Sequence, residues 1–198
     1  MILEKNIVGK NILLRTAEDE DAEFILQLRL NPRLNKYLKK IDPSIENQKE
    51  WIRQKKKEKN DFHMIIQDLG GVKWGVIALY SIDYKNETFD LGRWIISEKA
   101  PLFVAIESII LLYHFAFDTL GLQSALFEAR KENLRVIVFH KNLGAKIIGS
   151  DEKYVYFRFD KTAFRKILIM FQCFHNFRLN DFTNDKVQIR NLNENSIC

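Results

Sequence analysis

The feature that most constrains this chain is a nearly unbroken apolar run at residues 102–117, which only Glu107, Ser108 and His114 interrupt. The run is shorter than the roughly 20 apolar residues that a helix needs to cross a bilayer. It therefore predicts a helix buried in the core of a soluble, cytoplasmic protein that has no membrane span. Gly121 follows at the kind of position where helices commonly end.

The other elements follow from periodicity and turn residues on either side of this helix. Thr16 is the expected N-cap of a first helix and Ser44 that of a second, and Pro32 ends the first because the residue before a proline avoids helical backbone. Helices are expected from 16 to 31, from 44 to about 58, at 102–120, at 134–143 and at 163–171, and strands at 11–15, 62–67, 74–82, 88–96, 124–130, 145–149 and 153–159. This order predicts an α+β domain over residues 1–172 and a polar C-terminal tail at 173–198.

Charge and cysteine content limit the classes of site. The formal net charge of +5 suits an anionic small ligand, although charge alone does not separate such a ligand from weakly bound nucleic acid. The three lysines at 55–57 are interpreted as a solvated helix face, so no nucleic-acid partner is expected. Cys173 and Cys198 have no metal-ligand spacing around them, so neither a metal site nor a disulfide framework is expected.

Three short segments carry motifs. Residues 91–96 are L-G-R-W-I-I, residues 115–122 are F-A-F-D-T-L-G-L, and residues 133–144 are N-L-R-V-I-V-F-H-K-N-L-G. They resemble the fourth strand (I-G-Y-W-I), the end of the third helix, and the N-x-x-A-I-x-L-Y-E-K-L-G-F segment of the Gcn5-related N-acetyltransferase (GNAT) superfamily. Gly75 lies where that family has a glycine in the preceding strand. The resemblance covers about residues 11–159.

The resemblance implies a fold and a chemistry. The fold is a central, mostly antiparallel sheet of about seven strands flanked by helices and splayed between strands 4 and 5. The chemistry is direct transfer of an acetyl group from acetyl-CoA to a primary amine, with a general base and a general acid.

The resemblance also implies where acetyl-CoA binds. The pantetheine arm pairs with the fourth strand, and helix-start amides hold the pyrophosphate, because such amides form an anion site. The implied cofactor-binding residues are Arg93, Trp94, Ile95, Ile96, Lys99, Leu102, Phe103, Val104, Ala105, Ile106 and Asn133. The loop at 98–105 lacks the glycines of the family, so Lys99 is expected to supply charge there, and a GNAT-fold binding module without activity stays open. Asn133 also suits a helix N-cap.

Three residues are candidates for proton transfer. His140 lies where the family has the tyrosine that protonates the departing thiolate, and a purely structural histidine is the alternative. Asp90 lies where many relatives have a glutamate that acts as the base, and Glu128 on the opposite strand is the second candidate. For Asp90 the alternative is a solvent-facing strand residue.

The choice of acceptor is expected to depend on the first two helices and on the turn after the third strand. This region resembles two subfamilies, one acting on nucleotide-linked amino sugars and the other on protein N-termini, as the ribosomal-protein acetyltransferases do. The aromatic residues and the nearby cations Arg33, Lys36, Lys39 and Lys40 favour the anionic sugar nucleotide. The expected acceptor-binding residues are Arg29, Trp74, Tyr80 and Tyr84. A homo-oligomer stays open.

Overall fold

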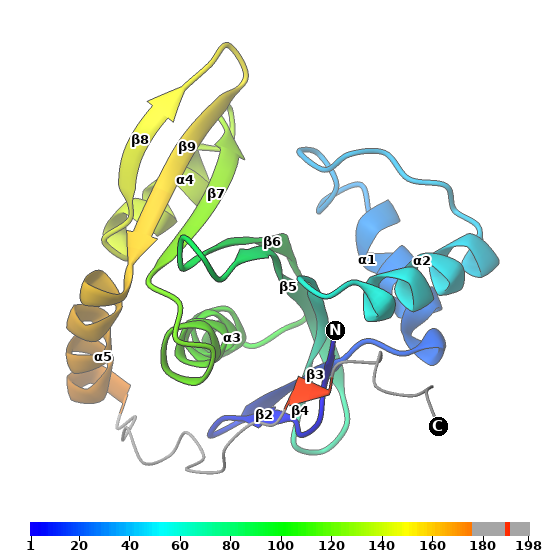
Figure 1. Ribbon diagram of the computed structural model, residues 1–198. Coiled ribbons are helices and arrows are strands. Elements are labelled where there is room, and N and C mark those ends of the chain that lie inside the picture. The colour runs from blue at the N-terminus through cyan, green and yellow to red at the C-terminus, as the bar shows by residue number, and fades with distance from the viewer. Residues whose placement is uncertain (176–188, 191–198) are drawn as a thin grey trace.

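The computed structural model describes the backbone of residues 1–175 and 189–190 and the side chains of residues 1–169. Its main sheet is open and mixed, with eight strands in the order β2-β3-β4-β5-β6-β7-β9-β8 (Figure 1). These strands are β2 (Ile7–Val8), β3 (Ile12–Thr16), β4 (Phe62–Asp68), β5 (Lys73–Asp83), β6 (Thr88–Ile96), β7 (Ser124–Arg130), β8 (Lys146–Ser150) and β9 (Tyr154–Asp160). A small second sheet pairs β1 (Ile2–Leu3) with β10 (Ile189–Arg190).

The predicted α+β class is confirmed, and β2 adds one strand to the expected seven. The five α-helices of the described part are α1 (Ala22–Leu30), α2 (Ile45–Lys57), α3 (Leu102–His114), α4 (Leu134–Asn142) and α5 (Lys161–His175). A 3₁₀ turn, η1 (Asp19–Asp21), precedes α1, and a π-helical segment, η2 (Phe115–Thr119), extends α3. Most of the predicted tail at 173–198 lies outside the described residues.

Alternating side chains of the central strands face two separate cores. On β4, Met64 and Ile66 contribute to the larger core, which contains α3, whereas Ile65 faces the smaller core under α1 and α2. Figure 1 shows α1 and α2 on one side of the sheet and α3 on the other. The sheet is therefore covered on both faces, and buried apolar residues on its central strands point into both cores.

The apolar run forms the predicted core helix. Residues 102–119 are the one helical segment of the described chain that is long and apolar enough to cross a membrane, and most of that segment is buried inside the fold. Glu107 lies at its centre with 0% exposure. Its carboxylate accepts hydrogen bonds from the backbone N–H of Asn11 at 2.8 Å and from the Asn11 side-chain amide at 2.9 Å. This contact ties α3 to the turn between β2 and β3.

Two local predictions were wrong. Thr16 ends β3 instead of capping a helix, and its hydroxyl accepts the Leu3 N–H at 2.9 Å. Glu18 and Asp21 form the capping box that starts the helical segment instead. The lysine run is only partly solvated, because Lys55 and Lys56 are half-buried and form ion pairs with Glu58 and Glu18.

Two other local predictions were confirmed. The Ser44 hydroxyl caps α2 by accepting the Asn47 N–H at 3.3 Å. The first helix ends at Leu30, because Asn31 before Pro32 is extended, with ψ 117°. Local turn chemistry therefore set these two boundaries.

Replacing Glu107 with Ala should lower the free energy of unfolding by about 3 kcal/mol, because the partly buried donors of Asn11 lose their acceptor and the buried side chain leaves a cavity. Urea denaturation of the variant and of the wild type measures this difference. The control is Glu152→Ala, an exposed glutamate in the turn before β9. A Glu107→Ala loss no larger than that of the control would show that α3 does not depend on this carboxylate.

Candidate active site

The strands β6 and β7 run parallel, and they pair over only three residue pairs: Thr88 with Ser124, Phe89 with Ala125, and Asp90 with Leu126. Beyond Asp90 the two strands diverge, while β7 stays paired with β9 as far as Arg130. Figure 1 shows β7, β8 and β9 leaning away from β6. The sheet therefore splays where the resemblance implied, and the facing edges of β6 and β7 lack ladder partners there.

A β-bulge accompanies the divergence. Val76 on β5 lies opposite Ile95, yet Ala78 lies opposite Gly92, so β6 has one residue more than β5 in this stretch. Arg93 within the bulge has a left-handed backbone with φ 49°. Such extra residues bend a strand and increase its local twist. The bulge thus turns β6 at the point where it separates from β7.

The Arg93 side chain is held from three directions. Its Nη1 donates to Asp61 Oδ1 at 2.7 Å, and that carboxylate is almost wholly buried. Its guanidinium lies 4.3 Å from the ring centroid of Tyr80 and 5.2 Å from that of Trp51. Ion pairing and cation–π contacts fix such a group strongly when water is excluded. Arg93 therefore links the bulge to the turn before β4, to β5 and to α2.

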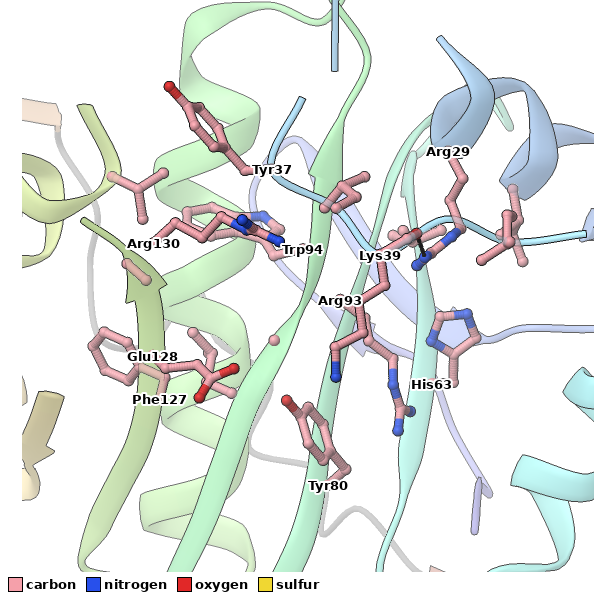
Figure 2. A pocket seen from close by; sticks show the side chains of 18 of the residues that line it. Arg29, Tyr37, Lys39, His63, Tyr80, Arg93, Trp94, Phe127, Glu128 and Arg130 are labelled. Atoms are coloured by element: carbon pink, nitrogen blue, oxygen red, sulfur yellow. Dashed lines mark hydrogen bonds between the residues drawn. The ribbon is translucent and has the colours of Figure 1, made fainter. Parts of the chain in front are cut away.

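The splay opens into a cavity of about 740 Å³ between the α1–α2 side and the β7–α4 side (Figure 2). Seven of the predicted site residues line it: Arg29, Tyr80, Arg93, Trp94, Glu128, Asn133 and His140. Tyr37 reaches across, because its hydroxyl donates to the carbonyl of Glu132 at 3.1 Å. The cavity is thus framed by elements from both halves of the splayed sheet.

Other predicted residues lie outside the cavity lining. Trp74 donates its indole N–H to Asp68 at 3.1 Å, and Tyr84 is 51% exposed in the turn between β5 and β6. Asp90 sits on the last paired position of β6. Ile95 packs under α1 and α2, and Val104 is buried in the larger core. The remaining predicted residues outside the lining are Ile96, Lys99, Leu102, Phe103, Ala105 and Ile106.

Sequence reasoning missed several lining residues. They are Tyr37, Trp51, His63, Arg130 and Tyr154. Trp51 and His63 contact each other edge to face, with ring centroids 4.9 Å apart, although they come from α2 and β4. In the sequence, His63 has no second histidine at metal-ligand spacing, so spacing alone assigns it no site. No local signal in the sequence marks it, because β4 is separated from β6 and the splay by β5.

His140 is buried against aromatic rings at the end of α4. Its ring centroid lies 4.3 Å from that of Phe127. Burial lowers the pKa of His140 to about 4, so the ring is neutral near pH 7. Asn133 occupies the N-cap position of α4, yet its side chain makes no capping hydrogen bond and is available to the cavity.

Tyr80 and Glu128 stand on opposite walls. Figure 2 shows the Tyr80 hydroxyl rising into the cavity from β5 and the Glu128 carboxylate entering it from β7. Burial, together with the carboxylates of Asp90 and Glu128, raises the pKa of Tyr80, and Arg93 works against this shift. The hydroxyl therefore stays protonated, and the carboxylate of Glu128 is the cavity's candidate proton acceptor.

The start of α3 leaves two amides available. The N–H of Val104 donates to Pro101, and that of Lys99 donates to the Ser97 hydroxyl. Within the described chain, the N–H groups of Leu102 and Phe103 have no protein acceptor. Free amides at a helix start, together with the helix dipole, attract anions.

Comparisons with known proteins agree with this geometry. A family model described as an acetyltransferase (GNAT) domain matches residues 11–146. The chain belongs to the GNAT acetyltransferase family. This GNAT protein is thus an acetyl-CoA-dependent N-acetyltransferase, as the resemblance of its motifs implied. A search of curated proteins finds no significant match.

Two solved structures illustrate its relatives. Apo FdhC, a nucleotide-linked sugar GNAT, is 33% identical, with 84% of this chain and 96% of that chain covered and a TM-score of 0.77. The spermidine N-acetyltransferase from Vibrio cholerae in complex with CoA and spermine is 17% identical, with 78% and 98% covered and a TM-score of 0.70. At that identity, the second structure supports the fold alone.

The two buried histidines of the cavity should make this GNAT protein sensitive to acid. Burial, with Arg93 and Arg29 nearby, lowers the pKa of His63 to about 3, and that of His140 is about 4, whereas unfolded histidine titrates near 6.5. The unfolded state therefore binds more protons below pH 6.5, so the stability falls as the pH drops from there toward 4. When the unfolded state binds two more protons than the folded state, the free energy of unfolding changes by about 2.7 kcal/mol per pH unit, which is the largest slope that these two histidines can give.

Urea denaturation between pH 4 and pH 7 tests this expectation. Replacing His63 or His140 with Leu should make the dependence on pH shallower by about one proton in each case. An unchanged slope in both variants would show that these histidines take up protons in the folded state.

Proposed function

We propose that this GNAT protein acetylates the amino group of a nucleotide-linked amino sugar. The single observation that carries the proposal is the open cavity at the splay, where Glu128 from β7 faces a wall of cations from α1 and β6. The 33% identity to a nucleotide-linked sugar GNAT over 84% of the chain supports the same acceptor class.

The residues present fit acetyl-CoA. The unpaired edge of β6 beyond Asp90 would hold the pantetheine arm, and the amides of Leu102 and Phe103 would hold the pyrophosphate. Acetyl-CoA supplies the acetyl group as an activated thioester. The loop has no glycines, but Leu102 is 92% exposed and Phe103 is exposed as well, so this end of α3 lies at the surface.

Glu128 suits the role of general base. An amine arrives in neutral water as an ammonium and must lose a proton before it attacks. The Glu128 carboxylate can accept that proton directly or through a water molecule, since it lines the cavity and Asp90 does not. His140 is neutral at rest, so its one ring N–H can donate a hydrogen bond to the sulfur of the departing thiolate, while the proton released by the amine goes to Glu128.

A polycationic acceptor fits this cavity less well. The cavity lining contains more positive than negative side chains. The cations are Arg29, Lys39, Arg93 and Arg130, and the carboxylates are those of Asp42 and Glu128. Asp42 already accepts hydrogen bonds from Ser44 and Asn47, each at 2.8 Å. A spermidine-like substrate would meet net repulsion on the α1 side, whereas a sugar nucleotide would be attracted.

Acetyl-CoA consumption should be fastest with amino-sugar nucleotides in a screen that also contains N-terminal peptides and polyamines. Glu128→Gln should lower kcat by about 100-fold or more, while Asp90→Asn and the exposed Glu152→Gln change it little. Turnover of peptides or polyamines alone would contradict the acceptor class. A larger loss in Asp90→Asn than in Glu128→Gln would move the base to Asp90.

Leu102→Pro should weaken coenzyme A binding about ten-fold, because it removes one amide donor. The change suits the backbone: a first helical position accepts proline, and Pro101 before it is already extended, with φ −56° and ψ 149°. Leu102→Ala is the matched control, since it removes the same side chain and keeps the N–H. Titration calorimetry giving equal affinities for the two variants would place the pyrophosphate elsewhere.

A further inference from the structure

The cavity wall formed by α1 and β4 contains buried polar atoms without partners. Both ring nitrogens of His63 and the Nε of Arg29 are buried, and within the described residues none of them has a hydrogen-bond partner. His63 is only 6% exposed. Buried polar atoms in folded proteins are nearly always hydrogen-bonded, so such a group of atoms indicates that a ligand or ordered water completes the site.

The charge on this wall is also uncompensated. Arg29 has no carboxylate partner in the described chain, and its Nη2 donates only to the carbonyl of Lys39 at 3.0 Å. Burial and the nearby Arg93 lower the pKa of Arg29, because both disfavour its charged form. By contrast, Arg93 has Asp61 at 2.7 Å, and Arg15 has Asp21 at 2.7 Å. An arginine kept without a counter-ion is expected to receive one from a ligand.

His63 complements this cation without adding charge. Its neutral ring can donate one N–H to an anion and accept at the other nitrogen. Its edge-to-face contact with Trp51 fixes the ring from behind. Lys39, whose carbonyl binds Arg29, also lines the cavity. Figure 2 shows Arg29, Lys39 and His63 together on the side opposite Glu128.

We propose that Arg29 and His63 form a phosphate-binding subsite for the acceptor substrate. This inference rests on the proposed function, because it gives the diphosphate of a sugar nucleotide its place on the α1–β4 wall. The sugar would then extend across the cavity toward Glu128, which takes the proton from its amine. The subsite is separate from the amides of Leu102 and Phe103, which belong to the coenzyme.

Binding of phosphate probes tests the subsite without any turnover. Inorganic pyrophosphate, UDP and dTDP are titrated into the protein by calorimetry, with coenzyme A at saturation so that the coenzyme's own phosphate site is filled. Uridine and thymidine are the uncharged controls. The diphosphates should bind and the nucleosides should bind at least ten-fold more weakly. Absence of binding by all the diphosphates at millimolar concentration would overturn the proposal.

Charge-matched variants locate the binding. Arg29→Gln should weaken the pyrophosphate Kd about ten-fold or more, as expected for the loss of a charge-assisted hydrogen bond. Lys57→Gln removes the same charge from an exposed position at the end of α2 and should leave the Kd unchanged. Equal effects of the two variants would show that binding depends only on net charge, which overturns the subsite.

The His63→Leu variant distinguishes a site in which a ligand satisfies the ring nitrogens of His63 from a site in which an ordered water does so. If the ring nitrogens lack partners until an anion binds, the leucine variant should keep or raise the Tm of the ligand-free protein and lose most of the pyrophosphate-induced rise in Tm. A lowered Tm together with an unchanged rise would mean that water satisfies His63, and the proposal would fail.

Failure of the subsite and failure of the proposed function give different results. Turnover of amino-sugar nucleotides with the same KM for the acceptor in Arg29→Gln and wild type would keep the function and reject the subsite. Tight, Arg29-dependent binding of diphosphates without turnover of any amino-sugar nucleotide would keep the subsite and reject the function.

Discussion

The pairing between β6 and β7 stops after three residue pairs, and the organisation of the active site depends on that stop. Two strands that separate inside a sheet expose backbone groups that would otherwise bond to each other. The fold tolerates the gap because each strand keeps its outer partner, β5 on one side and β9 on the other. The exposed edge of β6 then becomes a place where an extended ligand can bind as an extra strand would.

The separation is stabilised by side chains from outside the splay. Arg93 adopts a left-handed backbone that is unfavourable for most residues, and it compensates through Asp61, Tyr80 and Trp51. Asp61 is buried, and Lys55 also lies 3.6 Å from its carboxylate. The bulge is therefore part of an ion-pair network that reaches into α2. Substitutions in α2 can consequently alter the shape of β6 without touching a ligand.

The order of elements could be predicted because it depends on local sequence patterns. Examples are the apolar run of α3, the turn at 84–87 and the glycines at 70–71. The motifs at 91–96 and 133–144 predicted the family, and with it the splay. The structure brings Glu128, Asn133 and His140 into one cavity, while their predicted roles stay predictions.

The remaining features depend on contacts between distant segments. The cation Arg29 was expected near the acceptor, but the sequence gives no sign that its Nε lacks a partner or that His63 lies on the same wall. The salt bridge of Asp61 with Arg93 is equally hidden, because neither residue belongs to a local motif. The prediction that Thr16 caps the first helix was wrong because Glu18 and Asp21 form a capping box a few residues later.

Gly9 and Glu107 have a consequence for how this chain can change over evolution. A Cβ atom on Gly9 would lie 2.5 Å from the Glu107 carboxylate oxygen, so a side chain there would displace the acceptor that fixes α3. A Cβ atom there would also lie 3.0 Å from the Leu111 side chain and 3.2 Å from the Ile12 carbonyl oxygen, so a shorter residue at 107 would leave crowding at Gly9 and would take the acceptor from Asn11. Homologues are therefore expected to keep both a glycine at 9 and a glutamate at 107, because no single change at the other position compensates for the loss of either.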